Sequence, residues 1–378
     1  MRELRNTGHE CVLLATSDKP GLRKIEIDGI STWLAGIRNI YWPYHKNRPS
    51  APLRMIWHLV DCYNPMMQSY IRKVVAEEKP DVVSVHNLPG WSVASWRTLK
   101  KLHVPMVQVL HDHYNMCIKT TCFHAGRNCV RQCATCHALR LLHRRFSSEV
   151  NAVVGVSRYI LDHHRSFGYF GSVPIQRVIH NIRVPEILGT DVQSAKVKHD
   201  GFRFGFIGGL YPAKGIEYLI EAFRTANLLD TELWVAGSGK QDYEVQLRKH
   251  PCDPRIHFMG RVSPKDFYPH VDIVVVPSLL NDNLPGVVIE SLAFGKPVIG
   301  SRRGGIPEMI VDGYNGLLFE PENLSDFAAC LSKIYSDGDL YQYLEDNAKA
   351  SSKQFLDVSR WIMKYEAVYS EVQRAPGL

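Results

Sequence analysis

Residues 202–225, FRFGFIGGLYPAKGIEYLIEAFRT, run from a short apolar stretch through a glycine-bearing loop into an amphipathic stretch. The first six residues predict a buried strand and residues 215–225 predict a helix, which together form the repeating unit of a parallel α/β sheet. Further strands are predicted at 232–236, 256–259, 272–276 and 297–300. We therefore expect an α/β domain with a parallel sheet in this half of the chain.

The first half of the chain contains a second series of this kind, with strands predicted at 10–15, 81–86, 105–110 and 152–156. Residues 53–78 predict a helix that breaks near Asn64-Pro65, because proline disfavours helix in the residue before it. The polar segment 189–201 has no core periodicity and separates the two series. We expect two Rossmann-like, doubly wound domains, at 1–188 and 189–355, facing a central cleft where open α/β sheets bind ligands.

The N-terminal domain begins in an unusual way. Residues 1–8 predict the end of a helix that leads directly into the strand at 10–15. A doubly wound domain normally opens with a strand and a glycine-rich turn. We therefore expect an N-terminally shortened domain that lacks both.

Composition limits the class of protein. The 378 residues are 45% hydrophobic and 22% charged, as in a soluble two-domain protein. The apolar runs are far shorter than the roughly 20 residues of a membrane span, and the charged N-terminus is unlike a signal peptide, so we expect a cytoplasmic protein. The formal charge of +7 suits an anionic substrate or an anionic membrane surface. Nucleic acid is not expected, because no basic-aromatic strip is present.

The loop at 208–215, GGLYPAKG, is a candidate phosphate site. Gly208 and Gly209 allow close backbone approach, the following helix presents free N–H groups, and Lys214 adds a positive charge. No Ser or Thr follows the lysine, so this is not a Walker loop. An ordinary strand-to-helix turn with a solvated lysine is the alternative, and these residues alone leave both open.

Residues 277–299, PSLLNDNLPGVVIESLAFGKPVI, carry two carboxylates around a Pro-Gly turn. Asp282 lies on the loop after a predicted strand, and Glu290 lies within the apolar stretch of the next helix. A buried carboxylate needs partners, and sugar or ribose hydroxyls are suitable ones because one carboxylate accepts two of them. The alternative is a capping Asp and a helical Glu paired with a surface lysine.

Together, the 208–215 loop, the Asp282-x7-Glu290 segment and residues 301–308 (SRRGGIPE) resemble the retaining GT-B glycosyltransferases of bacterial family 4, the glycosyl transferases of group 1. The resemblance extends to 153–157, to His180-Asn181 and to a closing helix. It implies that residues 356–378 form a helix that crosses back to the N-terminal domain.

The resemblance also implies residue roles. Lys214 would stabilise the donor diphosphate, Glu290 would hold the nucleotide ribose, and Asp282 would bind hydroxyls of the transferred sugar. The remaining donor-binding set implied is Gly208, Gly209, Asn283, Leu284, Pro285, Gly286 and Val287. No catalytic metal is expected. Two departures stand out, since the family usually has Arg in place of Gly209 and more often Glu in place of Asp282.

His111 follows the strand at 105–110 and, by the same resemblance, would contact the donor sugar or lie beside the reacting centre. Lys214, His111 and Asp282 are thus the expected catalytic residues. A neutral imidazole can donate or accept a hydrogen bond there. The alternative for His111 is a histidine that pairs with backbone at a strand end.

Five of the nine cysteines fall in one loop: Cys117, Cys122, Cys129, Cys133 and Cys136. Their spacing is compatible with a structural zinc site that orders the loop. Free thiols or a redox-dependent disulfide are the alternatives. The following segment, 138–147 (ALRLLHRRFS), is basic and amphipathic. It predicts peripheral contact with anionic lipid at the inner face of the plasma membrane, or else the solvated face of a packed helix.

The expected function is retaining transfer of a hexose-type sugar from a UDP- or GDP-sugar to a glycan or lipid-linked acceptor, in polysaccharide or envelope glycan biosynthesis. One rival is a sugar-nucleotide epimerase on the same fold, which would need no acceptor. The other is a non-catalytic nucleotide-sugar-binding remnant, which the shortened N-terminus and Gly209 favour.

Overall fold

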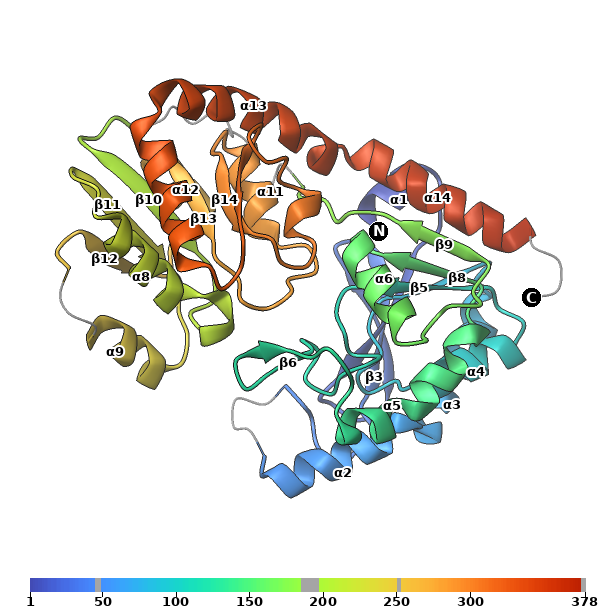
Figure 1. The fold of residues 1–378 in the computed structure, drawn as a ribbon. Coiled ribbons are helices and arrows are strands. Elements are labelled where there is room, and N and C mark those ends of the chain that lie inside the picture. Colours follow the sequence, from blue (N-terminus) through green and yellow to red (C-terminus); the bar gives the residue numbers. More distant parts are fainter. Residues whose placement is uncertain (45–48, 185–196, 250–252, 375–378) are drawn as a thin grey trace. The chain divides into compact units, whose positions relative to one another are not determined.

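The computed structural model describes residues 1–44, 49–184, 197–249 and 253–374. It divides into two compact units (Figure 1). The first unit contains Met1–Cys122, Cys129–Ile179 and Ser359–Leu378, and the second contains Phe123–Asn128 and His180–Val358. The predicted linker at 189–201 begins among residues that lie outside the described ones.

The second unit is built on a parallel sheet in the order β12-β11-β10-β13-β14-β15. The strands are β10 (Phe202–Ile207), β11 (Thr231–Ala236), β12 (Ile256–Gly260), β13 (Ile273–Val276), β14 (Val298–Ser301) and β15 (Gly316–Phe319). Numbered within this unit, the order is 3-2-1-4-5-6, that of a doubly wound dinucleotide-binding fold. Chain order therefore reverses between β10 and β13, which pair directly through Phe204 with Ile273 and Gly205 with Val274.

Helices cover both faces of this sheet (Figure 1). They are α8 (Ile216–Ala226), α9 (Gln241–Lys249), α10 (Pro264–Phe267), α11 (Gly286–Ala293), α12 (Leu324–Ser336) and α13 (Gly338–Leu356), with short 3-10 turns at Pro212–Lys214, Tyr268–His270 and Ile306–Glu308. Along β13, Ile273 and Val275 pack into one core cluster while Val274 and Val276 pack into the other. Both faces of the strand are buried, which explains its continuous apolar sequence.

The first unit contains two larger sheets. One is parallel, in the order β4-β5-β8-β9, and the other has the order β1-β3-β2, with β1 parallel and β2 antiparallel to β3. The strands are β1 (Val12–Ser17), β2 (Leu22–Ile27), β3 (Ile30–Gly36), β4 (Val83–Val85), β5 (Met106–Leu110), β8 (Ala152–Gly155) and β9 (Ile175–Val178). A small hairpin, β6 (Phe123–His124) and β7 (Arg127–Asn128), belongs to the second unit.

The helices of the first unit include the predicted break. They are α1 (Arg2–Asn6), α2 (Ala51–Cys62), α3 (Gln68–Glu78), α4 (Ala94–Lys101), α5 (Ala134–Phe146), α6 (Arg158–Ser166) and α14 (Val358–Arg374), with 3-10 turns at Pro65–Met67 and Ser147–Glu149. The break between α2 and α3 falls at Asn64, whose side chain accepts the backbone N–H of Met66. None of the helices in the described ranges combines the length and apolar character needed to span a bilayer.

The last helix, α14, is part of the first unit although it ends the chain. Glu366 accepts a hydrogen bond from the Thr7 hydroxyl and is 3.0 Å from His9 Nε2, and Arg177 forms an ion pair with Glu371. The buried side of α14 consists of Ile362, Tyr365, Val368 and Val372. The helix therefore completes the core of the unit that contains the N-terminus.

Candidate active site

Two loops meet where chain order reverses in the second unit. The loop after β10 carries Lys214, and the loop after β13 carries Asp282. Nζ of Lys214 lies 2.8 and 2.7 Å from the two carboxylate oxygens of Asp282. Ser278 Oγ donates a further hydrogen bond to the same carboxylate. In doubly wound sheets this crevice, outside the carboxyl ends of the strands, is the usual ligand site.

Backbone contacts hold these loops together. The N–H groups of Leu279 and Leu280 both donate to the carbonyl of Ala213, at 3.0 and 3.1 Å. Gly215 has φ 73°, and a Cβ there would overlap the carbonyl oxygen of Pro277. Only glycine fits without strain both this conformation and this approach, so it fixes the position of the adjacent Lys214.

A third loop, after β14, contacts the backbone of Asp282. The N–H of Gly305 donates to the Asp282 carbonyl at 2.7 Å, and Gly304, with φ 56°, leaves no room for a Cβ beside the same oxygen. Ser301 Oγ donates to the carbonyl of Ser278. The two arginines of this loop pair with acidic side chains, Arg302 with Asp312 and Glu320 and Arg303 with Glu322.

Glu290 lies in the second turn of α11 and has two partners in the second unit. Arg183 Nε donates to Oε1 at 2.8 Å, and the Tyr268 hydroxyl donates to Oε2 at 3.1 Å. A Cβ on Gly286 would overlap the Arg183 guanidinium, which therefore lies against the first turn of α11. Sequence reasoning missed Arg183 and Tyr268, since neither lies in the quoted motifs.

The glycines of the phosphate loop differ in role. Gly208 sits so close to the Gly237 backbone that its carbonyl oxygen would overlap a Cβ on Gly237. At Gly209, a Cβ would meet the ring of Tyr211 at 2.7 Å. The Tyr211 ring thus occupies the space that a larger side chain at 209 would need. Leu284 and Val287 are half-buried and pack against the core beneath α11.

The structure therefore brings Lys214 and Asp282 into direct contact and pairs Glu290 with Arg183. Both carboxylates belong to the segment that leaves β13 and enters α11. Their partners are separate cations, so the two ends of this segment each carry a balanced ion pair. Such an arrangement offers charges and hydrogen-bond acceptors for a ligand with phosphate and hydroxyl groups.

His111 lies in a small cavity of the first unit, lined by residues from the ends of β4 and β5: His86, Asn87, Leu88, Gln108, Val109, Leu110, His111, Asp112, Tyr114 and Asn115. Its Nε2 is 2.9 Å from His86 Nδ1, and the two rings stack with 25° between their planes. Burial lowers the pKa of His111, and burial together with His111 lowers the pKa of His86 to about 4. Both rings are neutral at pH 7.

A buried carboxylate contacts Tyr114, one of the residues that line this cavity. Asp61 of α2 accepts the N–H of Gly90 at 2.9 Å and the hydroxyl of Tyr114, and the Arg140 guanidinium lies 4.2 Å from the centre of the Tyr114 ring. Burial raises the pKa of Asp61 to about 7. Sequence reasoning missed Asp61, although an Asp in the otherwise apolar end of a helix was a usable signal.

The cysteine loop gives no support to the predicted zinc. Hydrogen bonds from Cys122 and Cys136 lower the pKa of Cys117. Cys117, Cys122 and Cys136 are buried, Cys129 is half-buried and Cys133 is exposed, and all five are free cysteines. Within the described part of the chain, no group of three or more His, Cys, Asp or Glu side chains is arranged to hold a metal ion.

The fold of the chain is that of the GT-B glycosyltransferases, and family models match both halves of its sequence. Residues 201–337 match the family described as glycosyl transferases group 1, and residues 1–181 match the glycosyl transferase 4-like domain. The chain belongs to this group and is a glycosyltransferase. The predicted fold class, α/β of the GT-B type, is confirmed.

Relatives and solved structures agree with this assignment. An uncharacterised protein from the cps region of Klebsiella pneumoniae is 26% identical over 80% of this chain and 79% of its own length. An uncharacterised glycosyltransferase of Methanocaldococcus jannaschii is 32% identical over 45% of this chain and 49% of its own. Sucrose-phosphate synthase from Thermosynechococcus elongatus superposes with a TM-score of 0.74 at 17% identity, covering 98% of this chain and 90% of that one. Anabaena HepE in complex with UDP and glucose superposes with a TM-score of 0.64 at 19% identity, covering 90% and 86%.

Proposed function

We propose that this glycosyltransferase moves a hexose-type sugar from a UDP- or GDP-sugar to its acceptor with retention of anomeric configuration. The observation that carries the proposal is the Lys214–Asp282 pair at the reversal point of the second sheet, on the segment that also bears Glu290. The cation supplies the charge that a departing nucleoside diphosphate requires, and the carboxylates accept hydroxyl groups.

Each group has a role in this proposal. Lys214 contacts the diphosphate, where negative charge builds as the bond to the sugar breaks. Asp282 accepts hydroxyls of the transferred sugar, and Glu290 accepts those of the ribose. Backbone N–H groups at the start of α11, around Gly286 and Val287, add hydrogen bonds to the donor. His111 stays a predicted catalytic residue; its neutral ring suits hydrogen bonding beside the reacting centre.

The proposed acceptor is a glycan or a lipid-linked saccharide of the cell envelope. The name of the Klebsiella relative places that protein in the cps region, and a Salmonella typhimurium relative named lipopolysaccharide 1,2-N-acetylglucosaminetransferase is 28% identical over 43% of this chain and 46% of its own length. We propose a cytoplasmic site of action, with peripheral contact at the inner face of the plasma membrane.

A ligand screen followed by a product assay tests the function. We expect UDP or GDP, and one of their sugars, to raise the melting temperature of the purified chain, because a ligand that binds the native state stabilises it by mass action. With that donor and an envelope glycan extract, proton NMR of the product should show an anomeric signal with the configuration of the donor.

Three outcomes would contradict the proposal. If no nucleotide shifts the melting temperature, the chain has no donor site of the proposed kind. Conversion of the sugar nucleotide into an epimer without acceptor would indicate an epimerase instead. Binding without turnover, in the presence of crude membranes and glycan extract, would indicate a non-catalytic protein.

A further inference from the structure

The small hairpin β6–β7 lies within the cysteine loop of the sequence but belongs to the second unit. Of the described residues before His180, only Phe123–Asn128 are part of that unit. The flanking residues Cys122 and Cys129 belong to the first unit, and the Cys129 N–H donates to the Cys122 carbonyl at 2.7 Å, which closes the base of the hairpin. Neither the fold nor the proposed donor contacts account for this insertion.

Asn128, the last residue of β7, makes two hydrogen bonds with the loop after β13. Its Nδ2 donates to the Leu279 carbonyl at 2.8 Å, and its Oδ1 accepts the Asn281 N–H at 2.9 Å. Because both partners are backbone groups with fixed roles, they determine the orientation of the amide. An amide can donate and accept at the same time, which an ionised carboxylate or a hydrocarbon side chain cannot do.

The stretch that Asn128 holds leads directly to Asp282. The N–H groups of Leu279 and Leu280, in the same stretch, donate to the Ala213 carbonyl at 3.0 and 3.1 Å. The loop is therefore held by main chain from the Lys214 loop and by one side chain from the hairpin. Its last residue before Asp282 depends on that side chain for the partner of its N–H.

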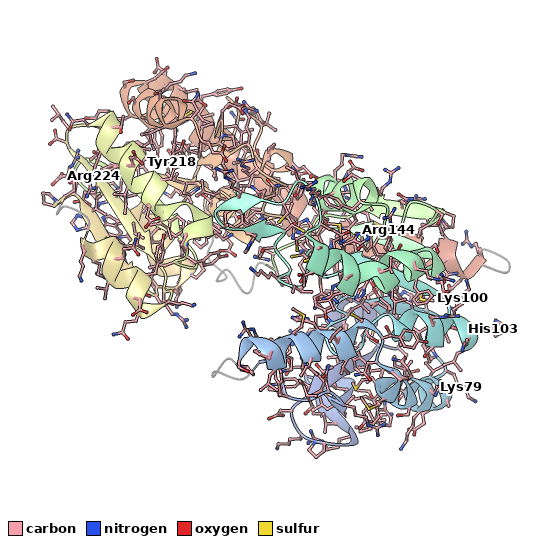
Figure 2. The ribbon with its side chains drawn as sticks, turned by 60° about the horizontal axis from the view of Figure 1, so that its bottom comes forward. Lys79, Lys100, His103, Arg144, Tyr218 and Arg224 are labelled. Carbon is pink, nitrogen blue, oxygen red and sulfur yellow. The ribbon has the colours of Figure 1, made fainter. Side chains whose placement is uncertain are left out.

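The two supports differ in strength. Ala213 lies just before α8, a helix of the core, and the ring of Tyr218 on this helix, labelled in Figure 2, has its centre 5.4 Å from that of Phe327. Asn128 instead extends from a hairpin whose strands have two residues each. So small a hairpin is not stable by itself. Loss of the Asn128 amide should thus free one side of the loop while the Ala213 side stays in place.

We propose that Asn128 is a positioning residue for Asp282, and that the β6–β7 hairpin thereby sets how well the enzyme holds the sugar of its donor. The inference rests on the proposed function, in which Asp282 accepts hydroxyls of that sugar. Asn128 acts on the main chain one residue before Asp282, so that the carboxylate meets the hydroxyls in hydrogen-bonding geometry. Lys214 and Glu290 lie on other supports, so contacts with the diphosphate and the ribose should not depend on Asn128.

A comparison of a nucleotide with its sugar tests the proposal on the full chain. We expect Asn128→Ala to raise the dissociation constant of UDP-glucose by about tenfold and that of UDP by less than about twofold, because only the sugar reaches Asp282. Calorimetry measures both, with GDP-mannose and GDP as the probes if the guanine compounds are the ones that bind. The matched control is Asn347→Ala, which removes an amide that donates to the Tyr343 carbonyl on α13 and should bind both probes like the wild type.

A double-mutant cycle shows whether Asn128 acts through Asp282. Asp282→Asn should itself weaken binding of UDP-glucose more than that of UDP. Adding Asn128→Ala should then cause no further loss, because the two residues act on the same contact. Additive losses would overturn the proposal.

The same measurements separate this inference from the proposed function. If Asp282→Asn leaves the binding of UDP-glucose unchanged, the sugar role of Asp282 is wrong, and the inference falls with it. If Asp282→Asn weakens that binding but Asn128→Ala does not, only the inference is refuted.

Backbone hydrogen exchange tests the contact without any nucleotide. In Asn128→Ala the Asn281 N–H loses its acceptor and should exchange at least about tenfold faster, whereas the N–H groups bonded to Ala213 should stay protected. Unchanged exchange at Asn281 would overturn the proposal. If Asn128→Ala does not fold, Asn128→Asp replaces it; this variant cannot donate to the Leu279 carbonyl and should also weaken the binding of UDP-glucose selectively.

Discussion

Nζ of Lys214 donates to both carboxylate oxygens of Asp282, so the proposed phosphate cation and the proposed sugar acceptor neutralise each other before any donor arrives. Both side chains are largely buried, 20 and 14% exposed. A donor with phosphate and hydroxyl groups provides replacement partners for each. The pair therefore keeps two charged groups in position at the sheet reversal point without leaving either unbalanced.

Removing the cation should abolish transfer. For Lys214→Ala we expect kcat to fall by ~10²–10³, because charge on the leaving diphosphate loses its counter-charge. The measurement is product formation at saturating donor. Lys240→Ala, which removes an exposed lysine that follows β11, is the control and should keep full activity. Activity of Lys214→Ala near that of the wild type would refute the phosphate role.

Glu290→Gln should weaken nucleotide binding by about tenfold, or ~1.4 kcal/mol, through loss of charged hydrogen bonds to ribose. Calorimetry with the nucleoside diphosphate measures the loss, and the 2′-deoxy analogue locates it. Glu290→Gln should weaken binding of the deoxy compound by less, since that compound already lacks one hydroxyl partner. Glu320→Gln, on an exposed residue, is the control. Equal losses for both nucleotides would place Glu290 away from the 2′-hydroxyl.

Gly215→Ala should destabilise the second unit by about 2 kcal/mol or more. The new Cβ would overlap the Pro277 carbonyl in a left-handed backbone conformation. Gly313→Ala provides the comparison, because Gly313 has nearly the same φ, 76°, but no atom within 4 Å of its added Cβ. The Gly313→Ala substitution should lower the free energy of unfolding by only about 1 kcal/mol. Urea unfolding of both variants measures the difference. Equal decreases in the free energy of unfolding would show that the Pro277 loop moves away from an added Cβ at little cost.

The first unit should lose stability in mild acid. Burial lowers the pKa of His86 and His164 to about 4 and lowers those of His113 and His143 well below the usual value. The unfolded chain then binds more protons between pH 4 and 6.5, so the free energy of unfolding falls as pH drops through that window. The raised pKa of Asp61 has the opposite effect, because protonation of this carboxyl increases the free energy of unfolding as pH drops. The histidines outnumber it, so we expect a net loss of stability.

Thermal unfolding at pH 7.5, 6 and 5 measures this dependence. The melting temperature should fall steadily, and His164→Asn should reduce the slope because it removes one titrating group. A melting temperature that rises toward pH 5 would show that Asp61 dominates instead.

The second unit could be predicted closely from sequence. Its β10 matches the predicted strand at 202–207, and β11 to β14 lie within one residue of their predicted bounds. For β13 and β14 the reason is burial on both faces, which requires a continuous apolar run. The hairpin β2–β3 was not predicted, since β2 is largely exposed and has no such run. Its Asp28-Gly29 turn, with φ of 51° and 74°, was the signal available.

The site was predictable only in part. Lys214 and Asp282 stand in recognisable motifs, and the sheet order brings those motifs together. The partners of Glu290 were not predictable, because Arg183 and Tyr268 reach it from 107 and 22 residues away.

Membership of α14 in the first unit reverses the order in which the chain can mature on the ribosome. The N-terminal unit is synthesised first, yet its core stays open until Ile362, Tyr365 and Val368 have been translated. The second unit, ending at Val358, has all its residues earlier. A nascent chain that stalls after residue 358 but before the rest of α14 would therefore carry all residues of the second unit and a first unit whose core is still exposed to chaperones and proteases.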